Sequence, residues 1–293
     1  MSAPAPELLE VLSLQAQGEG LFVAEPVQDG LERVFGGQLL GQALAAATHS
    51  VPEEWLCHSL HAYFVRPGKP GRPIAYEVYA LHDGQRAGTR RVIAVQREQV
   101  VLEMMASFGV EQPGAEYQEP MPDAPPPESF PPEDQRRARA LELAAPEQRR
   151  HMERKVPIEF IAIDERDPRD SAPSTGPLRY WMRVRGSLPS DARLHRCALA
   201  YASDMGALQA AMRAGGVAFL PSAVQLASLD HALWLHRPFL FDDWLLFTFH
   251  AMSVSASRGL SRGSVHTRDG KHVASIVQEG LMRVRTPAGL QTP

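Results

Sequence analysis

Leu226–Pro238 reads LASLDHALWLHRP, a strand-like apolar pattern interrupted by polar side chains at Ser228, Asp230, His231 and His236. A mostly apolar strand keeps polar residues where they find hydrogen-bond partners or perform chemistry. An ordinary half-buried strand whose polar residues face water explains this stretch alone equally well. The sequence on either side has to decide between the two interpretations.

The stretch ends in Arg237-Pro238, and the same dipeptide stands 171 residues earlier, at Arg66-Pro67. The same offset joins Gln38 with Gln209, Gly88 with Gly259, Arg91 with Arg262, Arg97 with Arg268 and Gly109 with Gly280. Both halves of the chain also predict a helix followed by several strands. One constant offset over this span, with a repeated order of elements, indicates an internal duplication.

The first half predicts a long helix at Gly37–His49, rich in small residues that allow close packing. The strands that follow show the period-two alternation of a sheet and are separated by turn signals. They are Leu56–Val65, Ile74–Leu81, Gly88–Gln96 and Val100–Val110. Before the helix, the pattern predicts a short helix at Pro6–Gln15 and short strands at Leu21–Pro26 and Arg33–Gly36. A helix with several antiparallel strands indicates an α+β layer in which the sheet wraps the helix.

The second half repeats this order around a predicted helix at Leu194–Ala214. Its predicted strands are Pro157–Asp164, Leu178–Val184, Val224–His236, Trp244–Val254, Gly259–Thr267 and His272–Val284. We therefore predict two domains, residues 1–112 and 156–293. Residues 113–155 join them, with an extended proline-rich linker over Glu111–Pro132 and a charged helix over Glu133–Lys155.

Composition and charge narrow the function further. The 293 residues carry a net charge of −4, which argues against a general nucleic-acid binder. Cys57 and Cys197 form no cluster with metal-ligand spacing, so we expect no metal and no cofactor. The sequence shows no signal peptide and no apolar run long enough to span a membrane. These features predict a cytoplasmic protein.

Three polar residues interrupt patterns that predict burial. Asp204 lies in the apolar stripe of the Leu194–Ala214 helix, Gln278 lies on the apolar side of the last strand, and Ser228 lies in the opening stretch. Each also has a purely structural explanation. Asp204 would be a helix-end carboxylate that reaches solvent, Gln278 a buried amide bonded to backbone, and Ser228 a small residue that fits the strand. Together, an acid, an amide and a hydroxyl are suited to hold and activate a water molecule.

A serine–histidine–aspartate arrangement is the alternative chemistry. It would use Ser228 with His231 or His236 and with Asp230 or Asp204. A serine nucleophile of this kind usually sits in a GxSxG turn, and the sequence contains none around Ser228. The water-activating interpretation is therefore the stronger one.

Seven segments carry a resemblance to a known family: FGGQLLGQALAAA, HSLHAYFVRPG, YASDMG, ASLDHALWLHRPF, DDWLL, SRGLSRG and VASIVQEG. They resemble the type II acyl-CoA thioesterases, the TesB-like family, over nearly the whole chain. The resemblance implies a double hotdog fold, in which two tandem domains each wrap an antiparallel sheet around a long helix. It also implies hydrolysis of acyl-CoA to a free fatty acid and CoA, and assembly into a homo-oligomer.

The resemblance places the catalytic trio on Asp204, Ser228 and Gln278, with Ser228 where many members carry threonine. It suggests His58 as an accessory substrate-binding residue, although a core or interface histidine explains that position equally well. Gly36 and Gly37 are further candidates for substrate binding, because the start of a helix offers backbone N–H groups to an anion or a carbonyl oxygen. Tight packing is the alternative explanation for these glycines.

The 171-residue offset places Cys57 opposite Ser228 and Ser107 opposite Gln278, and no acid lies opposite Asp204. We therefore predict one water-activating site per chain. Two other functions stay open: a non-catalytic hotdog protein that binds acyl-CoA or lipid, and a hotdog dehydratase.

Overall fold

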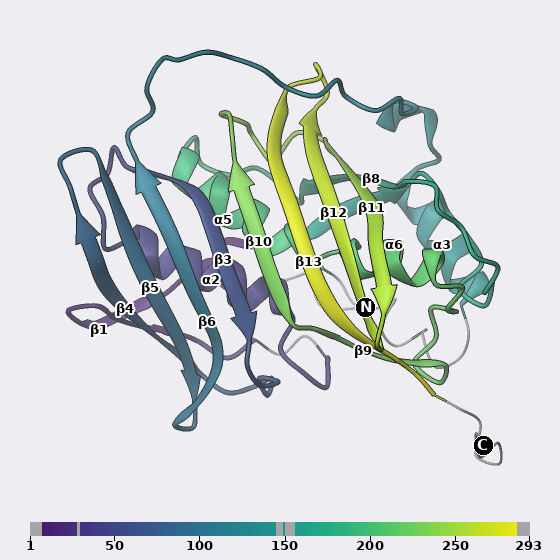
Figure 1. Cartoon of the computed structure of the whole chain (residues 1–293), viewed down its shortest axis with the longest axis horizontal. Coiled ribbons are helices and arrows are strands. Elements are labelled where there is room, and N and C mark those ends of the chain that lie inside the picture. The colour runs from purple at the N-terminus through teal and green to yellow at the C-terminus, as the bar shows by residue number, and fades with distance from the viewer. Residues whose placement is uncertain (1–7, 28–29, 145–148, 150–155, 286–293) are drawn as a thin grey trace.

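The computed structural model describes residues 8–27, 30–144, 149 and 156–285. In this part of the chain a single antiparallel sheet of 13 strands lies over a layer of helices (Figure 1). No helix among the described residues is long and apolar enough to cross a membrane.

The first half contributes two helices and six strands. In chain order they are α1 (Leu8–Leu12), β1 (Gln15–Gly18), β2 (Leu21–Ala24), α2 (Gly36–Thr48), β3 (Leu56–Phe64), β4 (Ile74–Asp83), β5 (Ala87–Gln96) and β6 (Gln99–Gly109). The predicted strand at Arg33–Gly36 is wrong, because the chain is irregular there and Gly36 already begins α2. Of the predicted opening helix, the described part is α1, and Gln15 begins a strand instead.

The remaining elements follow the linker. They are a 3-10 turn η1 (Pro127–Ser129), α3 (Glu133–Leu143), β7 (Ile158–Ala162), β8 (Leu178–Val184), α5 (Ala192–Ser203), α6 (Ala207–Ala214), β9 (Val224–Ser228), β10 (Asp230–Leu235), β11 (Leu245–Ser255), β12 (Arg258–Thr267) and β13 (His272–Val284). The charged helix predicted from Glu133 ends at Leu143, and most of the positions predicted beyond it lie outside the described residues.

Two predicted continuous elements are broken in the structure. The helix predicted over Leu194–Ala214 is divided into α5 and α6, because Gly206 adopts a φ of 91° that a continuing helix does not allow. The strand predicted over Val224–His236 is divided at Leu229 into β9 and β10. β9 pairs with β13, whereas β10 lies between β13 and β3.

The two halves share one sheet and one core. The strands are ordered β1-β2-β4-β5-β6-β3-β10-β13-β12-β11-β8-β7, so β3 and β10 join the halves. Beneath this junction α2 packs against α5. Gly41 permits the close approach, since a Cβ there would lie 3.2 Å from the carbonyl oxygen of Cys197. This is the double hotdog architecture that the resemblance implies.

Irregularities in the ladders recur at the 171-residue offset. The register shifts between Ala80 and His82 and again between Ala251 and Ser253. Matched shifts also occur after Ala94 and after Val265. Bulges are local features of a strand, so their repetition at one offset supports a duplicated scaffold.

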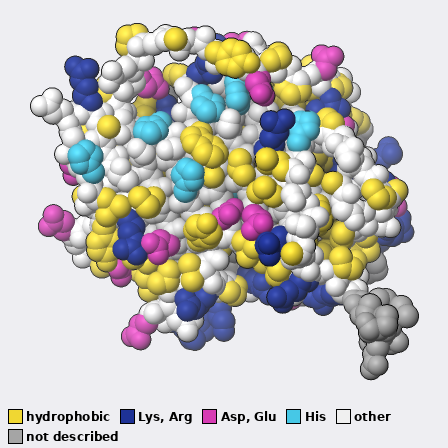
Figure 2. Space-filling model, in the orientation of Figure 1, with side chains coloured by type: hydrophobic (Ala, Val, Ile, Leu, Met, Phe, Trp, Pro, Cys, Tyr) yellow, Lys and Arg dark blue, Asp and Glu magenta, His cyan; other side chains and the backbone are white. Residues whose placement is uncertain are grey.

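Burial alternates along the central strands, as a sheet with one covered face requires. On β13 the alternating buried residues are Ala274, Ile276, Gln278, Gly280 and Met282, with Val273 buried as well at the start of the strand, and on β10 they are His231, Leu233 and Leu235. The opposite face of the sheet is open in Figure 2, where apolar and histidine side chains are mixed. Gln278 and His231 therefore point inward, toward the helices.

The segment Glu111–Pro132 forms no strand, contains the 3-10 turn η1 near its end and is attached to the second half. The side chain of Gln118 bonds to the backbone of Gly270 and His272, and the Trp181 indole donates to the carbonyl of Pro125. In Figure 1 this segment arches above the sheet before it reaches α3. The connection between the halves is therefore held on the protein surface.

Candidate active site

The three predicted polar residues come together. The Ser228 hydroxyl donates to Asp204 Oδ1 over 3.1 Å, and the Gln278 amide nitrogen donates to the same oxygen over 2.7 Å. The Gln278 nitrogen also donates to Ser228 Oγ over 2.8 Å. A helix end, the end of β9 and the middle of β13 thus supply one closed set of hydrogen bonds.

The break between α5 and α6 determines where Asp204 lies. Asp204 is the C-cap of α5, and the chain then turns through Gly206. A Cβ at Gly206 would lie 2.8 Å from the Tyr180 ring, so the turn needs glycine for space as well as for its positive φ. A continuous helix would have kept Asp204 within its apolar stripe; the break makes it a terminal residue.

The start of α2 faces the Asp204 carboxylate. The backbone N–H of Gly37 donates to Asp204. A Cβ on Gly36 would lie 2.6 Å from Asp204 Oδ2, and one on Gly37 would collide with the carbonyl oxygen of Tyr201. Both glycines are therefore required for close approach, and the anion that meets this helix start is the protein's own carboxylate.

The pKa of Asp204 is raised from its ordinary value to about 6, chiefly because burial removes water from the carboxyl group. Hydrogen bonds from Gln278, Ser228 and the Gly37 backbone act in the opposite direction. The residue nevertheless keeps part of its surface accessible. At neutral pH the group is therefore an ionised base whose proton affinity suits catalysis.

Two further residues extend the hydrogen-bonded set inward. His231 Nδ1 lies 3.0 Å from Gln278 Oε1, and His231 Nε2 lies 2.8 Å from the Ser203 hydroxyl. His231 is 1% exposed and Ser203 is fully buried. Sequence reasoning gives His231 only a general supporting role and does not consider Ser203; the signal for the contact with Gln278 is the alternation of His231 with Leu233 and Leu235 on the buried side of the strand.

The geometry does not favour the serine–histidine–aspartate alternative. Among the described residues, no hydrogen bond joins Ser228 to His231 or to His236, since His231 contacts Gln278 and His236 contacts Ser275. Asp230 accepts from the backbone N–H of Glu279 instead of from a histidine. The hydroxyl of Ser228 faces Asp204 directly.

His58 lies apart from this cluster. The residue is exposed at the bulge of β3, next to Cys57. Partial burial of its imidazole is the larger cause that lowers its pKa, and the Arg196 cation lowers it further. The opposite end of β3 is the one near the cluster, since Tyr63 pairs with Asp230. His58 and Asp204 thus lie at different ends of the shared sheet.

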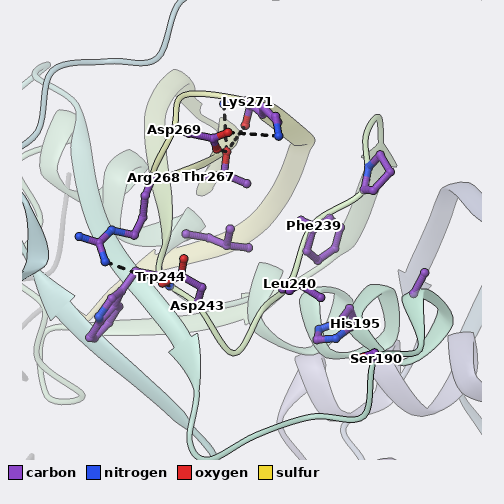
Figure 3. A pocket seen from close by; sticks show the side chains of 13 residues that line it. Ser190, His195, Phe239, Leu240, Asp243, Trp244, Thr267, Arg268, Asp269 and Lys271 are labelled. Carbon is purple, nitrogen blue, oxygen red and sulfur yellow. Dashed lines mark hydrogen bonds and ion pairs between the residues drawn. The ribbon is translucent and has the colours of Figure 1, made fainter.

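A cavity of about 510 Å³ also lies away from the cluster (Figure 3). It opens beside His195 in the first turns of α5, whereas Asp204 follows the last turn of that helix, roughly 14 Å from His195 along its axis. Its cations are paired with acids, Arg268 with Glu128 and Lys271 with Asp269. His195 Nδ1 accepts a hydrogen bond from the backbone N–H of Phe241. This histidine therefore stabilises the loop between β10 and β11.

The ladders correct two of the predicted counterparts, those of Gln278 and of Gly280. The first-half counterpart of Gly280 is Phe108 and not Gly109, because Gly280 pairs with Gly259 and Phe108 pairs with Gly88. Gln278 pairs with Ser261, and the matching pair in the first half is Ala106 with Arg90. The counterpart of Gln278 is therefore Ala106, not Ser107. The cause is a hairpin of different length: five residues separate the paired His266 and His272, whereas four separate Val95 and Val100.

Comparison with known proteins gives concordant matches. A model of the acyl-CoA thioesterase family matches residues 173–281, and a model of the acyl-CoA thioesterase N-terminal domain matches residues 23–109. Acyl-CoA thioesterase 2 of Haemophilus influenzae is 31% identical over 276 residues, covering 94% of this chain and 96% of its own length.

Solved structures agree. The crystal structure of an acyl-CoA thioesterase II, TesB2, from Mycobacterium marinum is 35% identical with a TM-score of 0.76, and the match covers 97% of this chain and all of that one. A conserved protein of unknown function with a hot dog fold from Alicyclobacillus acidocaldarius has a TM-score of 0.75 at 21% identity, over 95% and 98% of the two chains. The second match bears on the fold alone.

Proposed function

The chain belongs to the acyl-CoA thioesterase family, and from this premise we propose that Asp204, Ser228 and Gln278 hydrolyse an acyl-CoA thioester by activating a water molecule. The observation that carries the proposal is the closed set of hydrogen bonds on Asp204 Oδ1, on a carboxylate whose pKa is about 6. An ionised carboxylate at neutral pH can take a proton from water and so create the nucleophile.

The reaction proceeds by addition and elimination. Water, losing its proton to Asp204, forms a bond from its oxygen to the thioester carbonyl carbon. The resulting tetrahedral intermediate breaks its carbon–sulfur bond and expels CoA as a thiolate. The proton held by Asp204 then passes to that sulfur, so one water is consumed and one carboxylic acid and one thiol are formed.

Gln278 and Ser228 hold the base in position. Gln278 is fully buried, whereas Asp204 as a residue is only partly buried, so Asp204 lies nearer to solvent than Gln278. Both partners donate hydrogen bonds that favour the ionised carboxylate. The hydroxyl of Ser228 is directed at Asp204 in this arrangement, which gives serine the bonding role that threonine would have.

The test is thiol release from a panel of acyl-CoA thioesters of different chain length. We expect Asp204→Ala and Gln278→Ala to lower kcat by about 10²–10⁴-fold, the range for loss of a general base and its support. Unchanged turnover in either variant would exclude this site. Tight binding of acyl-CoA without thiol release would identify a binding protein, and hydration of an enoyl thioester would identify a dehydratase.

A further inference from the structure

We propose that His231 is a positioning residue for this site, holding the Gln278 amide in the orientation that donates to Asp204 and Ser228. The inference rests on the proposed function, since it assigns a role through Gln278 rather than through contact with the substrate. It starts from the four consecutive hydrogen-bonding groups Ser203, His231, Gln278 and Asp204.

The charge of Asp204 determines which way the amide must point. A carboxylate oxygen only accepts hydrogen bonds, so the Gln278 atom 2.7 Å from Asp204 Oδ1 has to be the nitrogen. The oxygen Oε1 then faces His231 Nδ1 at 3.0 Å, and that nitrogen has to carry a proton. With the amide reversed, two oxygens would face each other at the carboxylate.

The ring of His231 is suited to this task because it is neutral. Burial, the largest influence, lowers its pKa to about 4, with Gln278 acting in the opposite direction. A neutral imidazole carries one N–H, so when Nδ1–H donates to Gln278 the other nitrogen, Nε2, is an acceptor 2.8 Å from the Ser203 hydroxyl, which also lies 2.9 Å from the Ala200 carbonyl oxygen. The Gln278 oxygen thus requires the Nδ1–H tautomer, and the Ser203 hydroxyl supports that tautomer when its one proton is directed to Nε2 and not to the Ala200 carbonyl.

Burial makes the contact difficult to replace. Gln278 and Ser203 have no exposed surface and His231 is 1% exposed. Bulk water therefore has no access through which to satisfy Gln278 Oε1 if the imidazole is removed. Because an unsatisfied buried oxygen is costly, the Gln278 amide then rotates toward another donor. Its nitrogen no longer donates to Asp204.

The first half of the molecule supports the assignment. The 171-residue offset places Leu60 at the position of His231, and the ladder places Ala106 at the position of Gln278. Leu60 pairs directly with Ala106. The amide and the imidazole are thus present together in one half and replaced together by apolar residues in the other.

Three variants at one position separate the hydrogen bond from the volume of the ring. His231→Asn keeps a nitrogen donor where Nδ1 lies, His231→Gln places its amide toward the position of Nε2, and His231→Leu removes both. We expect kcat to fall about 10–100-fold in the leucine and glutamine variants with little change in KM. The asparagine variant should stay within about 3-fold of the wild type.

The pH profile provides a readout that a purely structural role would not move. The groups that set the pKa of Asp204 are burial and the donors Gln278, Ser228 and Gly37, and no charged side chain among the described residues contributes. Because donation from Gln278 lowers that pKa, its loss in His231→Leu should shift the acid limb of kcat/KM to higher pH. His231→Asn should keep the wild-type limb.

Asp204→Ala and Gln278→Ala are measured in parallel, with melting temperatures for every variant. If these two abolish turnover while His231→Leu keeps both kcat and the acid limb, the positioning role is wrong and the hydrolytic site stands. Equal impairment of folded His231→Asn and His231→Leu also contradicts it. If Asp204→Ala and Gln278→Ala leave turnover unchanged, the hydrolytic site itself is wrong.

Discussion

The two halves of the molecule share a scaffold but differ at the positions where chemistry would occur. At matched positions the second half carries Ser228, His231 and Gln278, whereas the first half carries Cys57, Leu60 and Ala106. All three first-half residues are buried at 3% exposure or less, and burial raises the pKa of the Cys57 thiol to about 12. A thiol of that pKa stays protonated and serves as packing.

The corresponding ends of the two central helices differ as well. Asp204 at the end of α5 meets the N-terminus of α2. At the other end, Arg193 of α5 donates to the carbonyl of Thr48 in the last turn of α2. Nearby, the buried Arg196 guanidinium donates to the Cys57 carbonyl over 2.6 Å and pairs with Glu111. Of the two equivalent helix ends, one thus carries the candidate catalytic carboxylate, and the other is stabilised by arginine hydrogen bonds and an ion pair.

The largest effect should come from giving the second half the first-half residues. Ser228→Cys combined with Gln278→Ala removes both donors from Asp204, and we expect kcat for thiol release to fall by at least about 10²-fold. Cys57→Ser is the matched control, because it places a hydroxyl in the half that has no counterpart of Asp204. A comparable loss in Cys57→Ser would contradict the assignment of chemistry to one half.

Replacing Arg196 should lower the stability of the protein without lowering its activity. Arg196→Met leaves the buried Cys57 carbonyl without its donor, and we expect unfolding to become easier by about 1–3 kcal/mol. Turnover per folded molecule should stay within about 2-fold, since Arg196 lies far from Asp204 along the helix. Denaturant unfolding and thiol release measure the two quantities, and a stable but inactive variant would contradict the comparison.

The pH dependence of turnover should follow Asp204. The base acts when ionised and its folded pKa is about 6, so kcat/KM should be level above that pH and fall about tenfold per unit below it. Ser228→Ala removes a donor that lowers this pKa, and the acid limb should move to higher pH. An acid limb that stays in place in Ser228→Ala would assign the titration to another group.

The second half should also be the acid-sensitive half. Burial chiefly lowers the pKa of His231 and His266 to about 4, and the offset places Leu60 and Val95 opposite them. Below about pH 6.5 these histidines become protonated in the unfolded chain but stay neutral in the folded protein. The free energy of unfolding therefore falls as pH decreases from about 6.5 to about 4. The raised pKa of Asp204 acts in the opposite sense.

Replacing His266 by its first-half counterpart checks this difference. Between pH 6.5 and 4 the melting temperature of His266→Val should fall less than that of the wild type. The reason is that the variant lacks the buried imidazole that is protonated only on unfolding. Hydrogen exchange in the same interval should show β12 and β13 losing protection before β5 and β6. Equal loss of protection in the two halves would count against histidine burial as the cause.

The smallest effect should come from Ser228→Thr. Threonine keeps the donor to Asp204 and restricts χ1 through its methyl group. We expect kcat within about 3-fold of the wild type, and a change in the preferred acyl chain length only where the added methyl contacts the substrate. A loss approaching that of Ser228→Ala would show that the site has no room for the methyl group.

Much of the fold could be predicted from the sequence because its signals are local and repeated. Period-two alternation, turn residues and the 171-residue offset gave the strands and the duplication. The breaks at Gly206 and Leu229 were not predicted, since Ala207 and Leu208 continue the apolar stripe of α5 and Leu233 continues the strand pattern. A single glycine such as Gly206 is a weak sequence signal for a helix break. Only the structure shows that the Tyr180 ring leaves no room for a side chain there.

The sequence alone identified a carboxylate, an amide and a hydroxyl as intrusions among apolar neighbours, and its motifs marked the family. Only the tertiary structure decided that Asp204 ends a helix against the start of α2, that Ala106 and not Ser107 opposes Gln278, and that His231 lies behind the amide. Residue type and period are properties of the chain, whereas hydrogen bonds among Asp204, Gln278 and His231 depend on helix ends and strand registers brought together from distant segments.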